Sequence, residues 1–126
     1  MPHSFHLSLP VKDYLETKNF YAEALGGTVE KETASWFNVN LYGHQLTFHV
    51  HPNKLLDNTY FHFGINVEYN LFYELFKKLQ SKNTFFELLP QTQHQGQSTE
   101  RVKMVFCDPN GYKLEFKAYK NPVQFF

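Results

Sequence analysis

The chain shows the same weak pattern twice, and this repeat constrains its fold more than any other feature. Residues 5–11 and 61–67 each alternate apolar residues with small or polar ones, as a half-buried strand does. A helical pattern follows each of them, over residues 14–25 and 71–80, with apolar side chains on one face. The sequence therefore predicts a strand followed by a helix in each half.

The ends of both helices carry recognisable signals. Asp13 and Glu16 form a capping box at the start of the first helix, and Asn70 can cap the second. The pair Gly26-Gly27 predicts the end of the first helix, because glycine readily adopts the left-handed conformation found there.

Shorter extended runs follow each helix. They cover residues 35–40 and 45–51 in the first half, and 101–107 and 112–119 in the second. Turn-forming residues separate the members of each pair, Tyr42-Gly43 in the first and Asp108-Pro109-Asn110-Gly111 in the second. Each half is therefore expected to hold a strand, a helix and about three strands.

Equivalent residues in the two halves keep a regular spacing. His6 and His62 are 56 residues apart, whereas Gly43 and Gly111 are 68 apart, so the second half carries a longer loop. That loop is predicted over Gln91–Thr99, where it either covers a site or lies on the surface. We expect a single α+β domain, residues 1–126, made of two modules of about 1–57 and 58–126.

The composition excludes several classes of protein. Twelve basic and twelve acidic residues leave no net charge, and no Lys/Arg-rich run suits nucleic acid. No stretch is apolar enough to cross a membrane, and the start of the chain does not resemble a signal peptide. With Cys107 as the only cysteine, a cytoplasmic location is the simplest expectation. Common motifs of nucleotide binding, serine hydrolysis and zincin proteolysis are absent.

Strand alternation gathers metal-capable side chains. It places His6, with Ser8 and Pro10, on the face that the helix does not cover. The same alternation of side chains puts His62 on the helix-free face of the second module. It also puts Glu115 on the face opposite to Leu114 and Phe116. Two imidazoles and a carboxylate can bind one side of a divalent ion and leave positions open for substrate. Iron(II), manganese, nickel and zinc all suit these ligands.

Further residues are candidates for binding or catalysis. His49 faces the cavity as a fourth ligand or a base, although Thr47 holds the position equivalent to Glu115. Trp36 is either a cavity or a core aromatic residue. Glu100 and Arg101, beside the long loop, either contact substrate or form a surface ion pair.

Several of these segments together resemble the vicinal oxygen chelate superfamily, which includes glyoxalase I, extradiol dioxygenases, and fosfomycin- and bleomycin-resistance proteins. The resemblance covers essentially the whole chain. Its carriers are residues 5–11 with Asp13, the helix end at Asn19-Phe20-Tyr21 and Leu25-Gly26, and the closing segments 108–111 and 114–116. Residues 43–46, 62–64 and 114–118 resemble a bacterial subgroup labelled glyoxalase- or dioxygenase-like.

The resemblance implies paired βαβββ modules that form a cupped mixed sheet around a metal. The usual ligand positions of the family match His6, His62 and Glu115. Glyoxalase I has an acidic fourth ligand where this chain has Thr47 or His49. An extradiol-type site needs only two histidines and one glutamate, with His49 as the candidate proton carrier.

The resulting hypothesis is a metal-dependent enzyme acting on a small substrate with vicinal oxygens. It would use His49 and Glu115 in catalysis, and Trp36, Thr47, Glu100 and Arg101 in substrate binding. The alternative is a metal-free binding protein of the bleomycin-resistance type. A thiol transferase acting on an antibiotic is a weaker reading, because no clear anion-binding set of Lys and Arg is apparent. We expect a homodimer.

Overall fold

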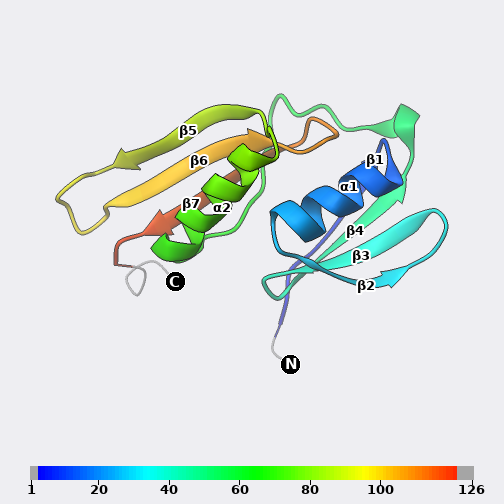
Figure 1. Ribbon diagram of the computed structural model, residues 1–126, viewed down its shortest axis with the longest axis horizontal. Helices are drawn as coiled ribbons and strands as arrows, with labels where there is room; N and C mark the ends of the chain where they lie inside the picture. The colour runs from blue at the N-terminus through cyan, green and yellow to red at the C-terminus, as the bar shows by residue number, and fades with distance from the viewer. Residues whose placement is uncertain (1–2, 122–126) are drawn as a thin grey trace. The chain divides into compact units, whose positions relative to one another are not determined.

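A computed structural model describes residues 3–121 of the chain. The chain divides into two compact units, and the boundary between them falls between Asp57 and Asn58. We call them unit 1 and unit 2 (Figure 1). Unit 1 is built as βαβββ and unit 2 as αβββ, which confirms the α+β class predicted from the sequence.

Unit 1 contains a four-stranded mixed sheet. Its strands are β1 (His6–Val11), β2 (Thr28–Glu32), β3 (Trp36–Leu41) and β4 (His44–Val50). They lie in the order β1-β4-β3-β2, with β1 parallel to β4 and the other pairs antiparallel. A short 3-10 helix, η2 (Pro52–Lys54), follows β4.

The first helix starts where the sequence predicts and changes its winding before the predicted end. The Asp13 carboxylate accepts a hydrogen bond from the backbone N–H of Glu16 at 2.8 Å, which confirms the cap. The regular helix α1 covers only Tyr14–Asn19 and continues as a π-helical segment, η1 (Phe20–Ala24). There the N–H of Leu25 donates to the carbonyl of Phe20, five residues back, at 3.2 Å.

The core of unit 1 lies between this helix and one face of the sheet (Figure 1). The ring of Tyr21 lies 4.5 Å from that of Phe48, and the ring of Tyr14 lies 4.9 Å from that of Phe37. Leu9 and Val11 are buried on the same side. His6, Ser8 and Pro10 consequently face away from the helix, as predicted.

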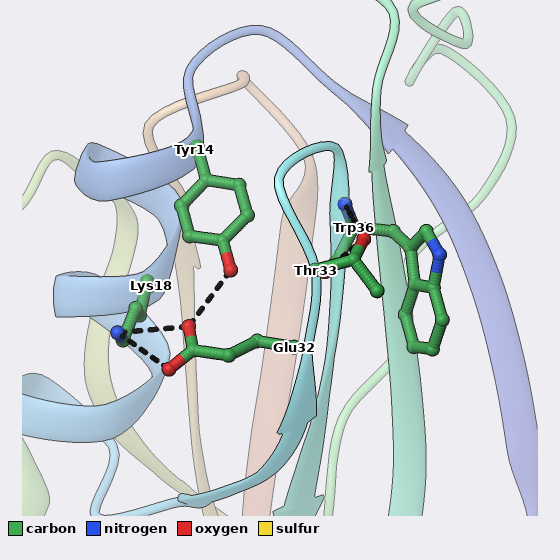
Figure 2. A network of polar contacts seen from close by, with 5 residues as sticks. All are labelled: Tyr14, Lys18, Glu32, Thr33 and Trp36. Atoms are coloured by element: carbon green, nitrogen blue, oxygen red, sulfur yellow. Dashed lines mark hydrogen bonds and ion pairs between the residues drawn. The ribbon is translucent and has the colours of Figure 1, made fainter.

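Polar contacts tie the edge strand β2 to α1, as Figure 2 shows. Glu32 accepts a hydrogen bond from the Tyr14 hydroxyl at 2.7 Å and from Lys18 Nζ at 3.0 Å. Burial and the Glu32 carboxylate raise the pKa of Tyr14 to about 12. The hydrogen bonds from Tyr14 and Lys18 in turn lower the pKa of Glu32.

Unit 2 repeats this arrangement with one incomplete strand. Its elements are α2 (Tyr69–Ser81), β5 (Phe86–Gln93), β6 (Arg101–Cys107) and β7 (Lys113–Tyr119), with the antiparallel order β5-β6-β7. The strand predicted over residues 61–67 is reduced to two parallel bridges, Phe63 to Leu114 and Asn66 to Lys117. It still runs beside β7, as β1 runs beside β4 in unit 1.

Two local predictions for unit 2 are wrong. Asn70 is not the helix cap, because α2 begins at Tyr69 with Glu68 in the capping position. The predicted loop 91–99 is shorter, because β5 continues to Gln93. This strand was missed because it contains Pro90 and has irregular register against β6, as edge strands often do.

Helix α2 covers the apolar face of the second sheet (Figure 1). It buries Phe72, Leu75 and Leu79. Aromatic rings continue this core from the helix through all three strands, at Phe76, Phe86, Phe106 and Phe116. None of the helices within residues 3–121 is long and apolar enough to span a bilayer.

Candidate functional site

The polar face of the sheet in unit 2 carries the candidate site. Along β7 the side chains of Leu114, Phe116 and Ala118 are fully buried, and the residues between them lie on the opposite face. That face presents Glu115 with Lys113 on one side and Lys117 on the other, as the alternation predicts.

The interrupted strand brings His62 to Glu115. The N–H of Phe63 donates to the carbonyl of Lys113 at 3.2 Å, and the N–H of Glu115 donates to the carbonyl of Phe63 at 2.9 Å. Gly64 lies so close to β7 that a β carbon there would be 2.6 Å from the carbonyl carbon of Glu115. Only glycine allows this approach without a shift of the backbone.

The two functional groups are in direct contact. His62 Nε2 lies 2.6 Å from Glu115 Oε2, slightly closer than the roughly 2.7–2.9 Å of a charge-assisted N–H···O hydrogen bond. The other carboxylate oxygen, Oε1, lies 3.6 Å from Lys103 Nζ. The side chain of Glu115 is only 14% exposed, whereas that of His62 is 58% exposed. The carboxylate is therefore sheltered and held on both oxygens, while the imidazole remains accessible.

These residues line an open cavity of about 630 Å³ within unit 2. His62, Lys103 and Glu115 contribute ionisable groups to its wall together with Lys113 and Glu87, which form a 3.2 Å ion pair. Tyr60, Phe61 and Leu88 contribute apolar surface. This volume is in the range that accommodates small-molecule ligands.

The donor atoms present suit a metal, although unit 2 supplies only two of them. Within each unit, over the described residues 3–121, no three side chains of His, Cys, Asp or Glu lie close enough to hold an ion. An imidazole nitrogen and a carboxylate oxygen are common donors to zinc and to first-row transition metals. Donors about 2.1 Å from one ion lie roughly 3.0–3.4 Å from each other, in octahedral and tetrahedral sites respectively, so His62 Nε2 and Glu115 Oε2 would need to separate by less than about 1 Å.

Glu100 and Arg101 do not pair with each other. Glu100 accepts a hydrogen bond from the N–H of Gly96 at 2.8 Å and lies 3.8 Å from Lys120 Nζ. Arg101 donates from Nε to Gln93 at 2.8 Å and from a terminal nitrogen to the Tyr119 hydroxyl at 3.3 Å. The predicted ion pair between Glu100 and Arg101 is therefore wrong, and the ion pair of Glu100 is with Lys120 instead.

Unit 1 presents the other predicted residues on its helix-free face. His6 is exposed and pairs in register with Gln45 on β4. Trp36 pairs with His49 across β3 and β4, with ring centroids 6.3 Å apart, and Figure 2 shows its ring on the side of the sheet away from Tyr14 and α1. The Trp36 side chain is therefore not part of the core.

Thr47 lies between these two residue pairs. Its hydroxyl donates to the Asn38 side-chain oxygen at 2.6 Å. Thr47 follows Leu46, which pairs with Leu7, just as Glu115 follows Leu114, which pairs with Phe63. The structure thus makes Thr47 the counterpart of Glu115, as the turn offset indicated.

Sequence reasoning missed Lys103 and Glu87. Alternation along residues 101–107 places Arg101, Lys103 and Val105 on one face, and this signal was present in the sequence. Only the pairing of β6 with β7 shows that this is also the face of Glu115, because Val105 lies opposite Glu115. Glu87 lies on the strand that the sequence analysis did not assign.

Solved structures share this fold over nearly the whole chain. A glyoxalase/bleomycin resistance protein/dioxygenase from Alicyclobacillus acidocaldarius has 24% identity and a TM-score of 0.81, covering 98% of this chain and 96% of that one. The fosfomycin resistance protein FosX from Listeria monocytogenes has 16% identity and a TM-score of 0.77, with coverages of 94% and 93%. An integron cassette protein from the mobile metagenome of the Halifax Harbour sewage outfall has 27% identity and a TM-score of 0.73, with coverages of 94% and 99%.

Sequence comparison gives the family. No curated protein matches the chain. The family model described as Glyoxalase/Bleomycin resistance protein/Dioxygenase superfamily matches residues 3–116, which is most of the sequence. Together with the fold, this match shows that the chain belongs to the glyoxalase/bleomycin resistance protein/dioxygenase superfamily, the vicinal oxygen chelate superfamily that its sequence resembles.

Proposed function

We propose that this protein is a divalent-metal-dependent enzyme of the glyoxalase or dioxygenase type, acting on a small substrate with vicinal oxygens. The observation that carries the proposal is the contact between His62 and Glu115 at the wall of a ligand-sized cavity. In this proposal His6 supplies a third ligand, as the family resemblance implies. Iron(II), manganese, nickel and zinc all accept two imidazoles and one carboxylate.

The residues around Glu115 would prepare the site for its charge. When bound, the metal would supply a Lewis acid and a template for the two substrate oxygens. Lys103 binds Oε1 of Glu115 and so directs Oε2 toward His62. The fully buried Leu114 and Phe116 on either side of Glu115 in the chain anchor β7 and fix the position of the carboxylate.

His49 is better suited to carry a proton than to be a fourth ligand. It pairs with Pro10 on β1, four residues beyond His6. That separation is about 13 Å along the strands at roughly 3.3 Å per residue. We assign His49 as a general acid or base, and Trp36, Thr47, Glu100 and Arg101 as residues that bind substrate.

The experiment that tests this function is the metal content of the purified, untagged protein, measured by elemental analysis. We expect about one equivalent per chain, with most of it lost in His62→Ala and Glu115→Gln. His94→Ala and Glu87→Gln are the matched controls, because each removes the same chemical group elsewhere in unit 2, and both should keep the metal. Full metal content in His62→Ala and Glu115→Gln, with native circular dichroism, would overturn the ligand assignment.

A metal-free binding protein is the second candidate, and one observation favours it. Tyr60, which is 96% exposed, and Phe61 both line the cavity and could stack on an aromatic ligand. In that case the protein would take up no metal on reconstitution, yet would bind catechols or aromatic antibiotics.

The assembly and location of the protein are also proposals. We infer a single domain formed by both units, a homodimer and a cytoplasmic location, on the grounds given by the sequence. Sedimentation of the untagged protein, with a mass of 15.0 kDa per chain, tests the dimer.

A further inference from the structure

Three basic side chains gather on the same face as Glu115, toward the C-terminal end of β7. Lys103 on β6 lies directly opposite Lys117 on β7, and Arg101 lies opposite Tyr119. All of them are half-buried. No clear set of basic residues on the cavity strands is apparent from the sequence alone, whereas the strand register shows that one exists.

The position of this basic cluster is unfavourable without a partner. Like charges directly opposite each other in an antiparallel pair repel and destabilise the sheet. The basic side chains cannot reach the opposite face of the sheet, because that face is filled by the buried core residues Val102, Met104, Phe116 and Ala118. The repulsion is therefore relieved only by negative charge on the polar face itself, and Glu115 supplies one such charge to Lys103.

Other lysines around this sheet have such a charge. Lys113 pairs with Glu87, Lys120 with Glu100, and Lys103 with Glu115. Lys117 and Arg101 differ, because within residues 3–121 no carboxylate lies in ion-pair range of either.

The contacts of Lys117 and Arg101 are instead with neutral groups. Arg101 donates to the Gln93 side-chain oxygen and to the Tyr119 hydroxyl. The Tyr119 ring lies 5.9 Å from the Arg101 guanidinium carbon and 6.0 Å from Lys117 Nζ. Two cations thus flank one aromatic ring, and their charges are not neutralised.

We propose that Arg101 and Lys117 bind an anionic oxygen group, a carboxylate or a phosphate, on a small-molecule ligand. Arginine offers a planar set of donors and lysine a compact charge, and together they suit such an anion. The Tyr119 hydroxyl accepts a hydrogen bond from Arg101 and so orients the guanidinium on this face.

The position of this anion site defines the ligand. Lys117 is two residues beyond Glu115 on the same face, which is about 7 Å along the strand. This inference rests on the proposed function. The substrate is a small acid whose anionic group lies about 7 Å from its vicinal oxygens. The anion site itself needs no metal, so it can be tested in the metal-free protein.

The test is a titration of metal-free, isotope-labelled protein with inorganic phosphate and, separately, with malonate, followed by the amide signals of residues 101, 117 and 119. Saturable shifts are expected with at least one of the two anions, and the tighter one shows whether the natural group is phosphate or carboxylate. Lys117→Gln and Arg101→Gln should each weaken binding about tenfold, as expected for one charge-assisted hydrogen bond.

Lys77→Gln is the matched control, because it removes one positive charge from an exposed site on α2 in the same unit. It should change the dissociation constant less than twofold. Lys117→Gln should also melt at or above the wild-type temperature when no anion is present, because a repulsive pair has been removed.

The results distinguish this inference from the proposed function. No saturable shift with either anion, or equal binding by Lys117→Gln and Lys77→Gln, would overturn the anion site even if the protein holds its metal. Retained anion binding in a protein that takes up no metal would support the anion site and reject the metal-dependent function.

Discussion

Gly64→Ala is predicted to displace the strand that carries His62. The added β carbon would lie 2.6 Å from the carbonyl carbon of Glu115, whereas β carbons in proteins essentially never come within 3.0 Å of another atom. Strand β7 cannot move away, because Leu114 and Phe116 on either side of Glu115 are fully buried. The Glu115 carbonyl oxygen would be closer still, so residues 62–66 must move by more than about 1 Å to restore an ordinary contact.

That movement breaks hydrogen bonds that are already long. The bond from the Phe63 N–H to Lys113 is 3.2 Å and the bond from the Lys117 N–H to Ile65 is 3.3 Å. Loss of two such bonds costs about 2 kcal/mol, and residual crowding raises the total to about 2–4 kcal/mol. Urea denaturation followed by circular dichroism measures this change in the free energy of unfolding.

Gly96→Ala is the matched control. Gly96 has a φ of +81°, and a β carbon there meets nothing within 4 Å, so only the left-handed backbone is strained. That strain costs about 1 kcal/mol. If Gly64→Ala loses no more stability than Gly96→Ala, the close approach of residue 64 to β7 is refuted.

Two predictions concern the helix and edge strand of unit 1. Asp13→Ala should lower the free energy of unfolding by about 1 kcal/mol, because the N–H of Glu16 loses its acceptor; an unchanged urea midpoint would contradict the cap. Tyr14→Phe removes the hydrogen bond to Glu32, and spectrophotometric titration should lose a tyrosinate that forms near pH 12. The Glu32 pKa is lowered on folding, so its stabilising contribution is present at neutral pH and fades as pH falls through the lowered value. The Tyr14 pKa is raised, so its stabilising contribution is complete below pH 10 and fades toward pH 12. In urea denaturation the free energies of unfolding of wild type and Tyr14→Phe should therefore converge at both low and high pH. A difference that stays constant with pH would refute the coupling.

The sequence by itself determined the features that depend on near neighbours. Alternation along β1 and β7 placed His6 and Glu115 on helix-free faces, because successive side chains of a strand point to opposite sides. The Asp13 cap was predictable for the same reason, since its acceptor and donor are three residues apart. The two-module plan followed from spacings that repeat along the chain.

Features without a local pattern were missed or misplaced. The edge strand β2, Thr-Val-Glu-Lys-Glu, is mostly exposed, so it has no apolar alternation to detect. The π-helical segment η1 contains a hydrogen bond from the Leu25 N–H to the Phe20 carbonyl and buries Tyr21 and Ala24, and no capping side chain marks its start in the sequence.

Only the tertiary structure decided which side chains meet within unit 2. His62 contacts Glu115 because a strand 53 residues away in sequence runs parallel to β7. Lys103 reaches Glu115, and faces Lys117, because β6 pairs with β7 in one particular register. A slip of one residue would move Lys103 to the buried face, yet nothing within either strand alone specifies its partner. Register is set by packing between segments that are distant in sequence. The sequence therefore predicted the metal-ligand candidates, but it did not predict that Lys103 and Lys117 lie beside Glu115.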